Sequence, residues 1–261
     1  MKVTFDSNVW RIVASPLTFL REQSISDFNA INDAIKTGRL IGCLSETVFT
    51  LEAIQKADRR RFFSDYCPEI KTSIAENENG SIGLSSSIGP DPSALSGNNP
   101  YLAKHLHDAL QLGFKLLPCP RVSGVNNPDL KHQWFLNLDE KTQEMANKFG
   151  AISREIETRG CGIYDMKQIG RRYAPANKPW IEGLKVAPDN EDKAIVKAVA
   201  EWADGDAIAA HYAHENDLFC SRDKAKSAGV SSILSINNRS WLEASYGIKF
   251  VTPEELANII T

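Results

Sequence analysis

The sequence lacks a long hydrophobic run. No stretch approaches the roughly 18 uncharged apolar residues that a membrane-spanning helix needs, and the residues after Met1 do not form the apolar segment of a signal peptide. We therefore expect a cytoplasmic protein that does not enter a membrane. An excess of positive charge is also missing, because the formal net charge is −3. This argues against a generally basic nucleic-acid-binding protein.

Metal and cofactor motifs are scarce as well. Five cysteines occur, an odd number, without a CxxC pair, which favours buried reduced thiols over a disulfide framework or a zinc site. The motifs GxSxG, GxxxxGKS/T and GxGxxG are absent, so a hydrolase elbow, a P-loop and a dinucleotide fingerprint are not supported. The pairs His105/His107 and His211/His214 have no acids at zinc spacing, which favours structural or surface histidines.

What the chain does contain is an alternation of short apolar runs with amphipathic segments. The alternation predicts an α/β fold with three layers, in which helices cover both faces of a central, mostly parallel five-stranded sheet. The predicted strands are residues 2–5, 39–44, 113–118, 217–223 and 248–251. The predicted helices are residues 7–36 with a break at Pro16, 46–56, 102–110, 139–158, 191–202, 204–213 and a last one that starts at Pro253 with Thr252 as its cap.

Two stretches show no periodic apolar face. Residues 76–100 are rich in Asn, Gly, Ser and Pro and are predicted to form a long loop. Residues 163–190 contain three prolines and are predicted to be irregular. We interpret the chain as a single domain, residues 1–261, with a large, mainly helical and loop insertion at about 57–190.

Two carboxylates come directly after predicted strands. Asp6 ends the first strand, and Asp223 follows the fourth. The carboxyl ends of parallel strands meet at one edge of the sheet, where ligands bind, so these acids can converge although each of them could instead form an Asx turn. Converging carboxylates need a cation, and Mg²⁺ or Mn²⁺ suits a site made of oxygen ligands.

A third acid faces inward if residues 46–55 form a helix. Glu52 then falls between Val48 and Phe49 on the apolar arc, where a carboxylate is costly unless it is paired or bound to a metal. Glu46 falls in the first helical turn, where the helix dipole favours an acid. Glu52 is therefore preferred to Glu46 as the functional acid. A surface glutamate is the alternative, should the helix have another phase.

The fourth acid stands at the start of an almost wholly apolar segment, residues 207–213. Asp204 suits the N-cap of this predicted helix, which leaves Asp206 to point into the cleft. Taken alone, this pair is divided between capping and chemistry, and the other acids favour chemistry. The predicted catalytic and metal-binding carboxylates are therefore Asp6, Glu52, Asp206 and Asp223.

In this order the motifs resemble those of the PIN-domain nucleases. The resemblance lies in Asp6-Ser7-Asn8, in Glu52 within an apolar segment, in Asp206-Ala207-Ile208-Ala209-Ala210, and in Ser221-Arg222-Asp223, where Ser replaces the family's Thr. It covers roughly residues 1–60 and 191–261, and the region between them is far larger than in most small members. The resemblance implies a nuclease that uses Mg²⁺ or Mn²⁺, most often an endoribonuclease, with Asn8 and Ser221 orienting ligands or water.

Three functions are open on the sequence alone. The first is an endoribonuclease acting on single-stranded or structured RNA, with DNA as the other nucleic acid to consider and with a protein inhibitor or a second copy as further partners. The second is a non-catalytic PIN-like module that binds RNA or protein. The third is a metal-dependent small-molecule phosphatase, although Asp6-Ser7-Asn8 lacks the DxD start of the aspartate-nucleophile phosphatases.

The region between the matched segments carries basic and aromatic residues that can be interpreted in two ways. The clusters 59–61 and 171–172, together with Tyr173 and Trp180, could bind the phosphates and bases of a single strand. Solvated surface for the arginines and core packing for the aromatic rings are the simpler interpretation.

Overall fold

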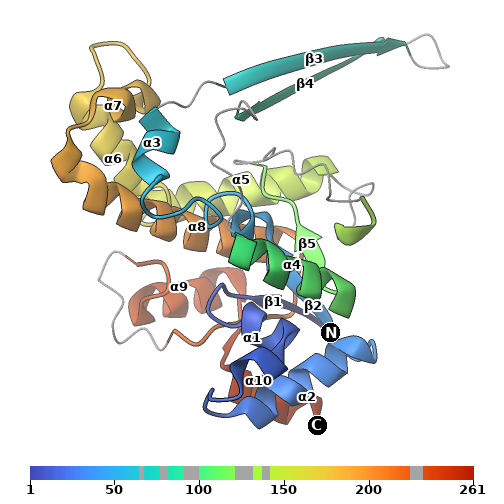
Figure 1. Ribbon diagram of the computed structural model, residues 1–261. Coiled ribbons are helices and arrows are strands. Elements are labelled where there is room, and N and C mark those ends of the chain that lie inside the picture. The colour runs from blue at the N-terminus through green and yellow to red at the C-terminus, as the bar shows by residue number, and fades with distance from the viewer. Residues whose placement is uncertain (65–67, 77–81, 91–99, 121–131, 137–141, 224–231) are drawn as a thin grey trace.

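The fold is built on a five-stranded sheet in which every strand pair is parallel (Figure 1). The strands follow the order β5-β2-β1-β6-β7. They are β1 (Lys2–Phe5), β2 (Ile41–Ser45), β5 (Lys115–Leu117), β6 (Leu218–Cys220) and β7 (Phe250–Val251). The computed structural model describes residues 1–64, 68–76, 82–90, 100–120, 132–136, 142–223 and 232–261.

Helices cover both faces of this sheet, as the alternating sequence pattern predicts. One face carries α1 (Trp10–Ala14), α2 (Ile25–Lys36), α4 (Pro100–Leu112) and α10 (Pro253–Ile260). The other carries α5 (Thr142–Thr158), α8 (Asp192–Ala213) and α9 (Ile236–Tyr246). The predicted three-layer α/β/α architecture is therefore confirmed. Among the described residues, no helix is both long enough and apolar enough to cross a membrane.

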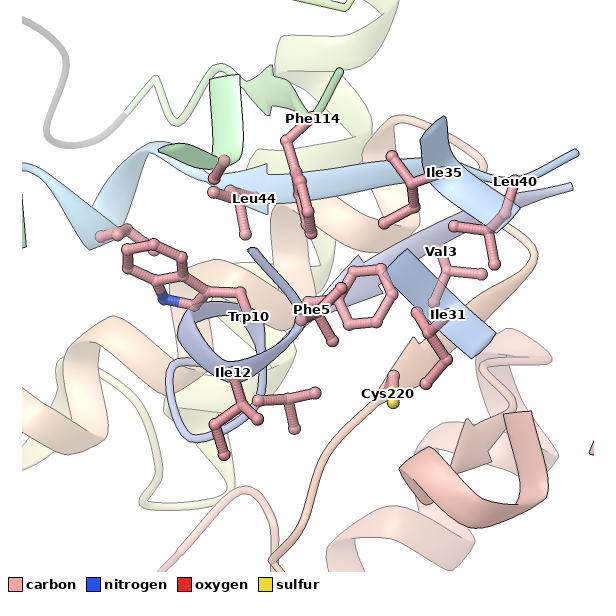
Figure 2. Close-up of a cluster of buried hydrophobic side chains, with 14 of the residues drawn as sticks. Val3, Phe5, Trp10, Ile12, Ile31, Ile35, Leu40, Leu44, Phe114 and Cys220 are labelled. Carbon is pink, nitrogen blue, oxygen red and sulfur yellow. The ribbon is translucent and has the colours of Figure 1, made fainter. Parts of the chain in front are cut away.

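The strands alternate their side chains between two cores. Val3 and Phe5 face the core under α1 and α2, which Figure 2 shows in close-up. There Phe5 meets Phe114 edge to face, with ring centroids 5.4 Å apart. Burying a side chain of this size stabilises the fold by about 1.5–3 kcal/mol. Thr4, between the two, faces α8, where its Oγ1 lies 2.9 Å from Nδ1 of His211.

A third apolar core lies beyond the sheet, between α3 (Arg59–Ser64), α6 (Tyr164–Tyr173), α7 (Trp180–Val186) and the first half of α8. The prediction that residues 163–190 are irregular is wrong. The prolines in this stretch flank the helices instead of interrupting them, since Pro175 follows α6 and Pro179 precedes α7. Short 3₁₀ turns complete the described structure at Pro16–Phe19, Glu46–Val48, His132–Trp134 and Asp189–Glu191.

An antiparallel hairpin of β3 (Pro68–Glu76) and β4 (Ile82–Pro90) forms a sheet of its own (Figure 1). The prediction of one long loop over residues 76–100 is therefore wrong for β4, whose sequence alternates Ile82, Leu84 and Ile88 with small residues at strand period. Residues 77–81 and 91–99 lie outside the described residues.

Much of the region between 57 and 190 belongs to the body of the fold. β5 pairs with β2 at an edge of the main sheet, and α4 and α5 supply buried residues to the cores on its two faces. Of the described α-helices and strands in this region, α3, α6, α7 and the two strands of the hairpin lie outside those two cores. The helical elements that pack on α8 thus bring the middle of the sequence close to residues 191–213.

Candidate active site

The site lies where the order of the strands reverses. β1 has β2 on one side and β6 on the other, and the register pairs Phe5 with Cys220. The next residues, Asp6 and Ser221, therefore emerge side by side at the carboxyl edge of the sheet. This is the place where open parallel sheets bind their ligands.

Asp6 is held by donors from both strand ends. Ser221 Oγ donates to Asp6 Oδ2 over 2.6 Å, Asn8 Nδ2 donates to the same oxygen over 2.9 Å, and the Ser7 amide donates to Oδ1 over 2.6 Å. Ser221 Oγ in turn accepts from the amide of Asp223 at 3.0 Å. The structure thus places Asn8 and Ser221 against Asp6, where both side chains fix the orientation of its carboxylate.

Glu52 reaches the same site, but without the predicted helix. Residues 46–56 form only the 3₁₀ turn at Glu46–Val48 and then further turns, so the helix prediction is wrong. The β-branched residues Thr47, Val48 and Thr50 have low helix propensity, and the Glu52 amide donates to Thr47 O at 2.9 Å instead of to a helical partner. The carboxylate of Glu52 is buried, as the predicted inward orientation requires, but the helix on which that prediction relied does not form.

The electrostatic surroundings of Glu52 link its carboxylate to Asp6. Burial of its carboxylate and the nearby charge of Asp6 raise its pKa to about 7, against smaller opposing effects from a hydrogen bond of Ser7 and from the charges of Arg59 and Arg11. Part of the residue remains accessible. A carboxyl group of this pKa is about half protonated near neutrality, mainly because it is buried.

Glu46, the alternative to Glu52, has a different environment. It is buried, and its Oε2 accepts from the backbone amide of Cys119 at 2.8 Å. Burial raises the pKa of the Cys119 thiol, and the charges of Glu46 and Asp206 raise it further. Glu46 therefore belongs to a group around Cys119.

The helix that carries the fourth acid does not start where the sequence indicates. α8 runs without a break from Asp192 to Ala213, so the predicted restart at Asp204-Gly205-Asp206 is wrong, and Asp204 is not an N-cap. Gly205 serves close packing instead of breaking the helix. A Cβ on Gly205 would lie 2.8 Å from the Cα of Gly162, closer than real side chains come.

Asp204 and Asp206 point to opposite sides of α8, since two residues turn a helix by roughly 200°. Burial raises the pKa of Asp204 well above its usual value, and the charges of Asp6 and Glu52 add to this effect, followed by those of Glu201 and Asp223. Asp206 is buried, and its Oδ2 accepts from Trp202 Nε1 at 2.9 Å. The structure thus groups Asp204 with the acids at the strand ends, while Asp206 lies beside Trp202 and acts on Cys119. We call the following four carboxylates the acid cluster: Asp6, Glu52, Asp204 and Asp223.

Two arginines counter the charge of the acid cluster. Arg59 interacts with Glu52 and Asp204, and Arg239 interacts with Asp223 and Asp6. Arg239, on α9, is held by the carbonyl of Leu234 at 2.9 Å from its Nε. Burial nevertheless raises the pKa of Asp6, and the charge of Asp223 contributes to the rise. The negative charge of the cluster is therefore only partly compensated by the protein.

The donor set of the acid cluster suits a hard divalent cation. Carboxylate oxygens are the preferred ligands of Mg²⁺ and Mn²⁺, and a cation among them would relieve the repulsion that contributes to the raised pKa values of Asp6, Glu52 and Asp204. Within the described ranges, no group of three or more His, Cys, Asp or Glu side chains is arranged to hold a metal ion. The fit therefore rests on the chemistry of the donors, and binding would require the side chains to adjust.

The remaining sequence candidates have structural roles. His211 is buried against Thr4, as predicted for a structural histidine. Tyr173 donates its hydroxyl to Glu191 at 2.8 Å, and Trp180 packs against Trp202, so both rings contribute to the fold. Four cysteines are buried and not disulfide-bonded, while Cys67 lies outside the described residues. They are Cys43, Cys119, Cys161 and Cys220.

Sequence reasoning did not assign roles to Arg59 or Arg239 at the site. Arg59 is buried, so a solvated surface is the wrong interpretation for it. Residues 59–61 are all arginine, so the sequence does not distinguish Arg59 from its two neighbours. No protein-family model matches the sequence, and neither a curated protein nor a solved structure matches the chain.

Proposed function

We propose that the protein is a metal-dependent endonuclease of PIN type, and specifically an endoribonuclease that hydrolyses RNA phosphodiesters. The observation that supports this most is the acid cluster. Four segments that are far apart in the sequence each contribute a carboxylate to the carboxyl edge of the sheet, where the charges oppose one another. Asp204 takes the role that the sequence pattern assigned to Asp206.

The carboxylates of the cluster would bind the metal ion, and the neighbouring polar side chains would orient them. Asp6, Glu52, Asp204 and Asp223 would hold Mg²⁺ or Mn²⁺, which when bound activates water for attack on a phosphodiester and stabilises the leaving oxygen. Ser221 and Asn8 keep the Asp6 carboxylate in one orientation through their hydrogen bonds. Asn8 Oδ1 also accepts from the Arg222 amide at 3.0 Å, which ties the two strand ends together.

The direct test is cleavage of single-stranded and structured RNA, with DNA of the same sequence in parallel. Asp6→Asn and Asp223→Asn keep the shape of each side chain but remove its charge, so both variants should lose cleavage while their circular dichroism stays unchanged. Asp217→Asn is the matched control, because Asp217 follows α8 at the opposite edge of the sheet and accepts from the Lys2 amide. Full activity of either cluster variant, or in excess chelator, would refute the proposal.

A second candidate is a non-catalytic module that binds RNA or protein on the same scaffold. The observation that favours it is the β3–β4 hairpin, which forms a separate two-stranded sheet that projects from the body (Figure 1). Isolated hairpins are marginally stable in water, so a partner would stabilise this one. Binding that survives chelation, without turnover in any divalent ion, would support the second candidate over the first.

A further inference from the structure

One guanidinium joins Asp223 to the turn that precedes α9. Arg239 Nη2 donates to the backbone carbonyl of Asp223 at 2.5 Å, and its Nε donates to that of Leu234 at 2.9 Å. The guanidinium also lies over the ring of Phe250 on β7, with Cζ 4.9 Å from the ring centroid. Three contacts therefore fix this side chain, and one of them is with the backbone of an acid of the cluster.

The turn to which Leu234 belongs is itself held in place. The amide of Ile233 donates to Glu201 Oε1 on α8 at 2.7 Å, and Asn238 Nδ2 on α9 donates to the first carbonyl of the turn at 2.8 Å. Ile233 and Leu234 are both buried in the core that α5 and α8 cover. Arg239 therefore ties Asp223 to a fixed part of the fold.

From Asp223 the hydrogen bonds continue to Asp6. The Asp223 amide donates to Ser221 Oγ at 3.0 Å, and this hydroxyl donates to Asp6 Oδ2 at 2.6 Å. The backbone of Asp223 thus contacts Ser221 on its amide side and Arg239 on its carbonyl side. Because β6 ends at Cys220, Asp223 lies beyond the strand pairing, and side chains supply both of these contacts.

We propose that Arg239 is a positioning residue, which sets the place of the Asp223 carboxylate by holding the backbone of Asp223. A side chain that takes part in catalysis must stay within about 0.5 Å of its productive position, so the residues around it have to brace it. The inference rests on the proposed function for the use of Asp223 in cleavage. The bracing itself can be measured without any cleavage.

The first measurement is amide hydrogen exchange of the full chain, followed by nuclear magnetic resonance. In Arg239→Gln the Asp223 amide should exchange about tenfold faster, because a hydrogen bond from a charged donor no longer restrains the backbone there. The Ser221 amide, which donates to Val251 O at 3.0 Å, should keep its wild-type rate. A general loss of stability would accelerate both amides together.

Two further variants isolate the contact. Arg239→Lys keeps the positive charge but lacks the planar fork that reaches both carbonyls, so it should also accelerate exchange at Asp223. Arg159→Gln is the matched control. Arg159 Nε donates to Asn238 on α9 at 3.1 Å, and its guanidinium lies over the ring of Trp241 at 4.4 Å, but neither contact involves Asp223. Exchange at Asp223 should therefore be unchanged in this variant.

The second measurement is steady-state cleavage of RNA. Both Arg239 variants should lower kcat by about tenfold or more and leave KM within about twofold of wild type, because a displaced carboxylate affects the chemical step more than substrate binding. Arg159→Gln should cleave like the wild-type protein.

Wild-type exchange at Asp223 in Arg239→Lys, or faster exchange with an unchanged kcat, would overturn the inference and leave the proposed nuclease standing. No cleavage by the wild-type protein would refute the nuclease and the catalytic use of Asp223, while faster exchange would still assign the bracing of this residue to Arg239. Arg239→Lys decides if Arg239→Gln fails to fold.

Discussion

Asp204 and Asp206 stand two residues apart on one helix, but they belong to chemically different groups. Asp204 lies with the acid cluster, where burial and then the charges of other carboxylates raise its pKa. Asp206 faces the opposite side, near Glu46 and Cys119. Its carboxylate accepts from the indole of Trp202, just as Glu46 accepts from an amide. We call Glu46 and Asp206 the inner pair.

The comparison shows that burial alone does not mark a functional acid. A buried carboxylate with a neutral hydrogen-bond donor is satisfied in place, and the inner pair is of this kind. Asp6 also accepts from neutral donors, so hydrogen bonding alone does not separate the two groups. What distinguishes the acid cluster is that its carboxylates raise one another's pKa values.

The largest expected effect is on cleavage. Asp204→Asn should lower RNA cleavage by about a hundredfold or more, because it removes a charge from the acid cluster. Asp206→Asn should stay within about threefold of wild type, since an amide oxygen can still accept from Trp202. Single-turnover cleavage in Mg²⁺ measures both. The reverse ranking would return the catalytic role to Asp206 and remove the distinction between the groups.

A smaller effect is expected on stability, and it should follow the inner pair. Asp206→Ala leaves the buried Trp202 Nε1 without its acceptor and should lower the free energy of unfolding by about 1–3 kcal/mol. Asp206→Asn keeps an acceptor and should cost less. Urea unfolding of the metal-free protein measures the difference. Equal losses in the two variants would show that charge, and not the hydrogen bond, holds Asp206.

The smallest effect is a pH dependence of the acid cluster in the absence of metal. The pKa of Glu52 is raised from 4.5 to about 7, so the folded protein holds a proton that the unfolded chain releases. Stability from this proton is complete below pH 4.5 and is lost as the pH rises through 7. Unfolding should therefore cost on the order of 1 kcal/mol less at pH 8 than at pH 6.5.

Glu52→Gln should flatten this pH profile, and so should saturating Mg²⁺, which favours the ionised form. The interval from pH 6.5 to 8 avoids His211, whose pKa is lowered to about 3 by burial and whose contribution to stability is lost only as the pH falls below 6.5. Glu46→Gln is the control in the inner pair. An unchanged slope in Glu52→Gln would show that Glu52 does not titrate with the cluster.

The strands and the acids at their ends could be predicted from the sequence because their signals are local. Asp6 and Asp223 follow short apolar runs, and parallel pairing then brings them to one edge. The α/β architecture follows from the same alternation. The hairpin was missed because its serine-rich strand resembles a loop in composition, although its apolar residues recur with period two.

The errors around α8 and Arg59 arise from contacts that are distant in sequence. Gly205 resembles a helix breaker until Gly162 is packed against it. Arg59 resembles a surface charge until the carbonyl of Val196, 137 residues away, accepts from it. Glu52 was chosen through a helix that does not form. In each case a tertiary contact outweighed the local propensity on which the prediction relied.

The contact between Gly162 and Gly205 sets how closely α8 packs against the turn at Gly162, at the level of Asp204 and Asp206. With no side chain on either residue, the two backbones approach so closely that a Cβ on Gly205 would lie 2.8 Å from the Cα of Gly162. Asp204 and Asp206 stand on either side of Gly205 in the sequence, so a shift of α8 at this contact would move both carboxylates. A methyl group at residue 205 would therefore displace carboxylates of the acid cluster and of the inner pair together.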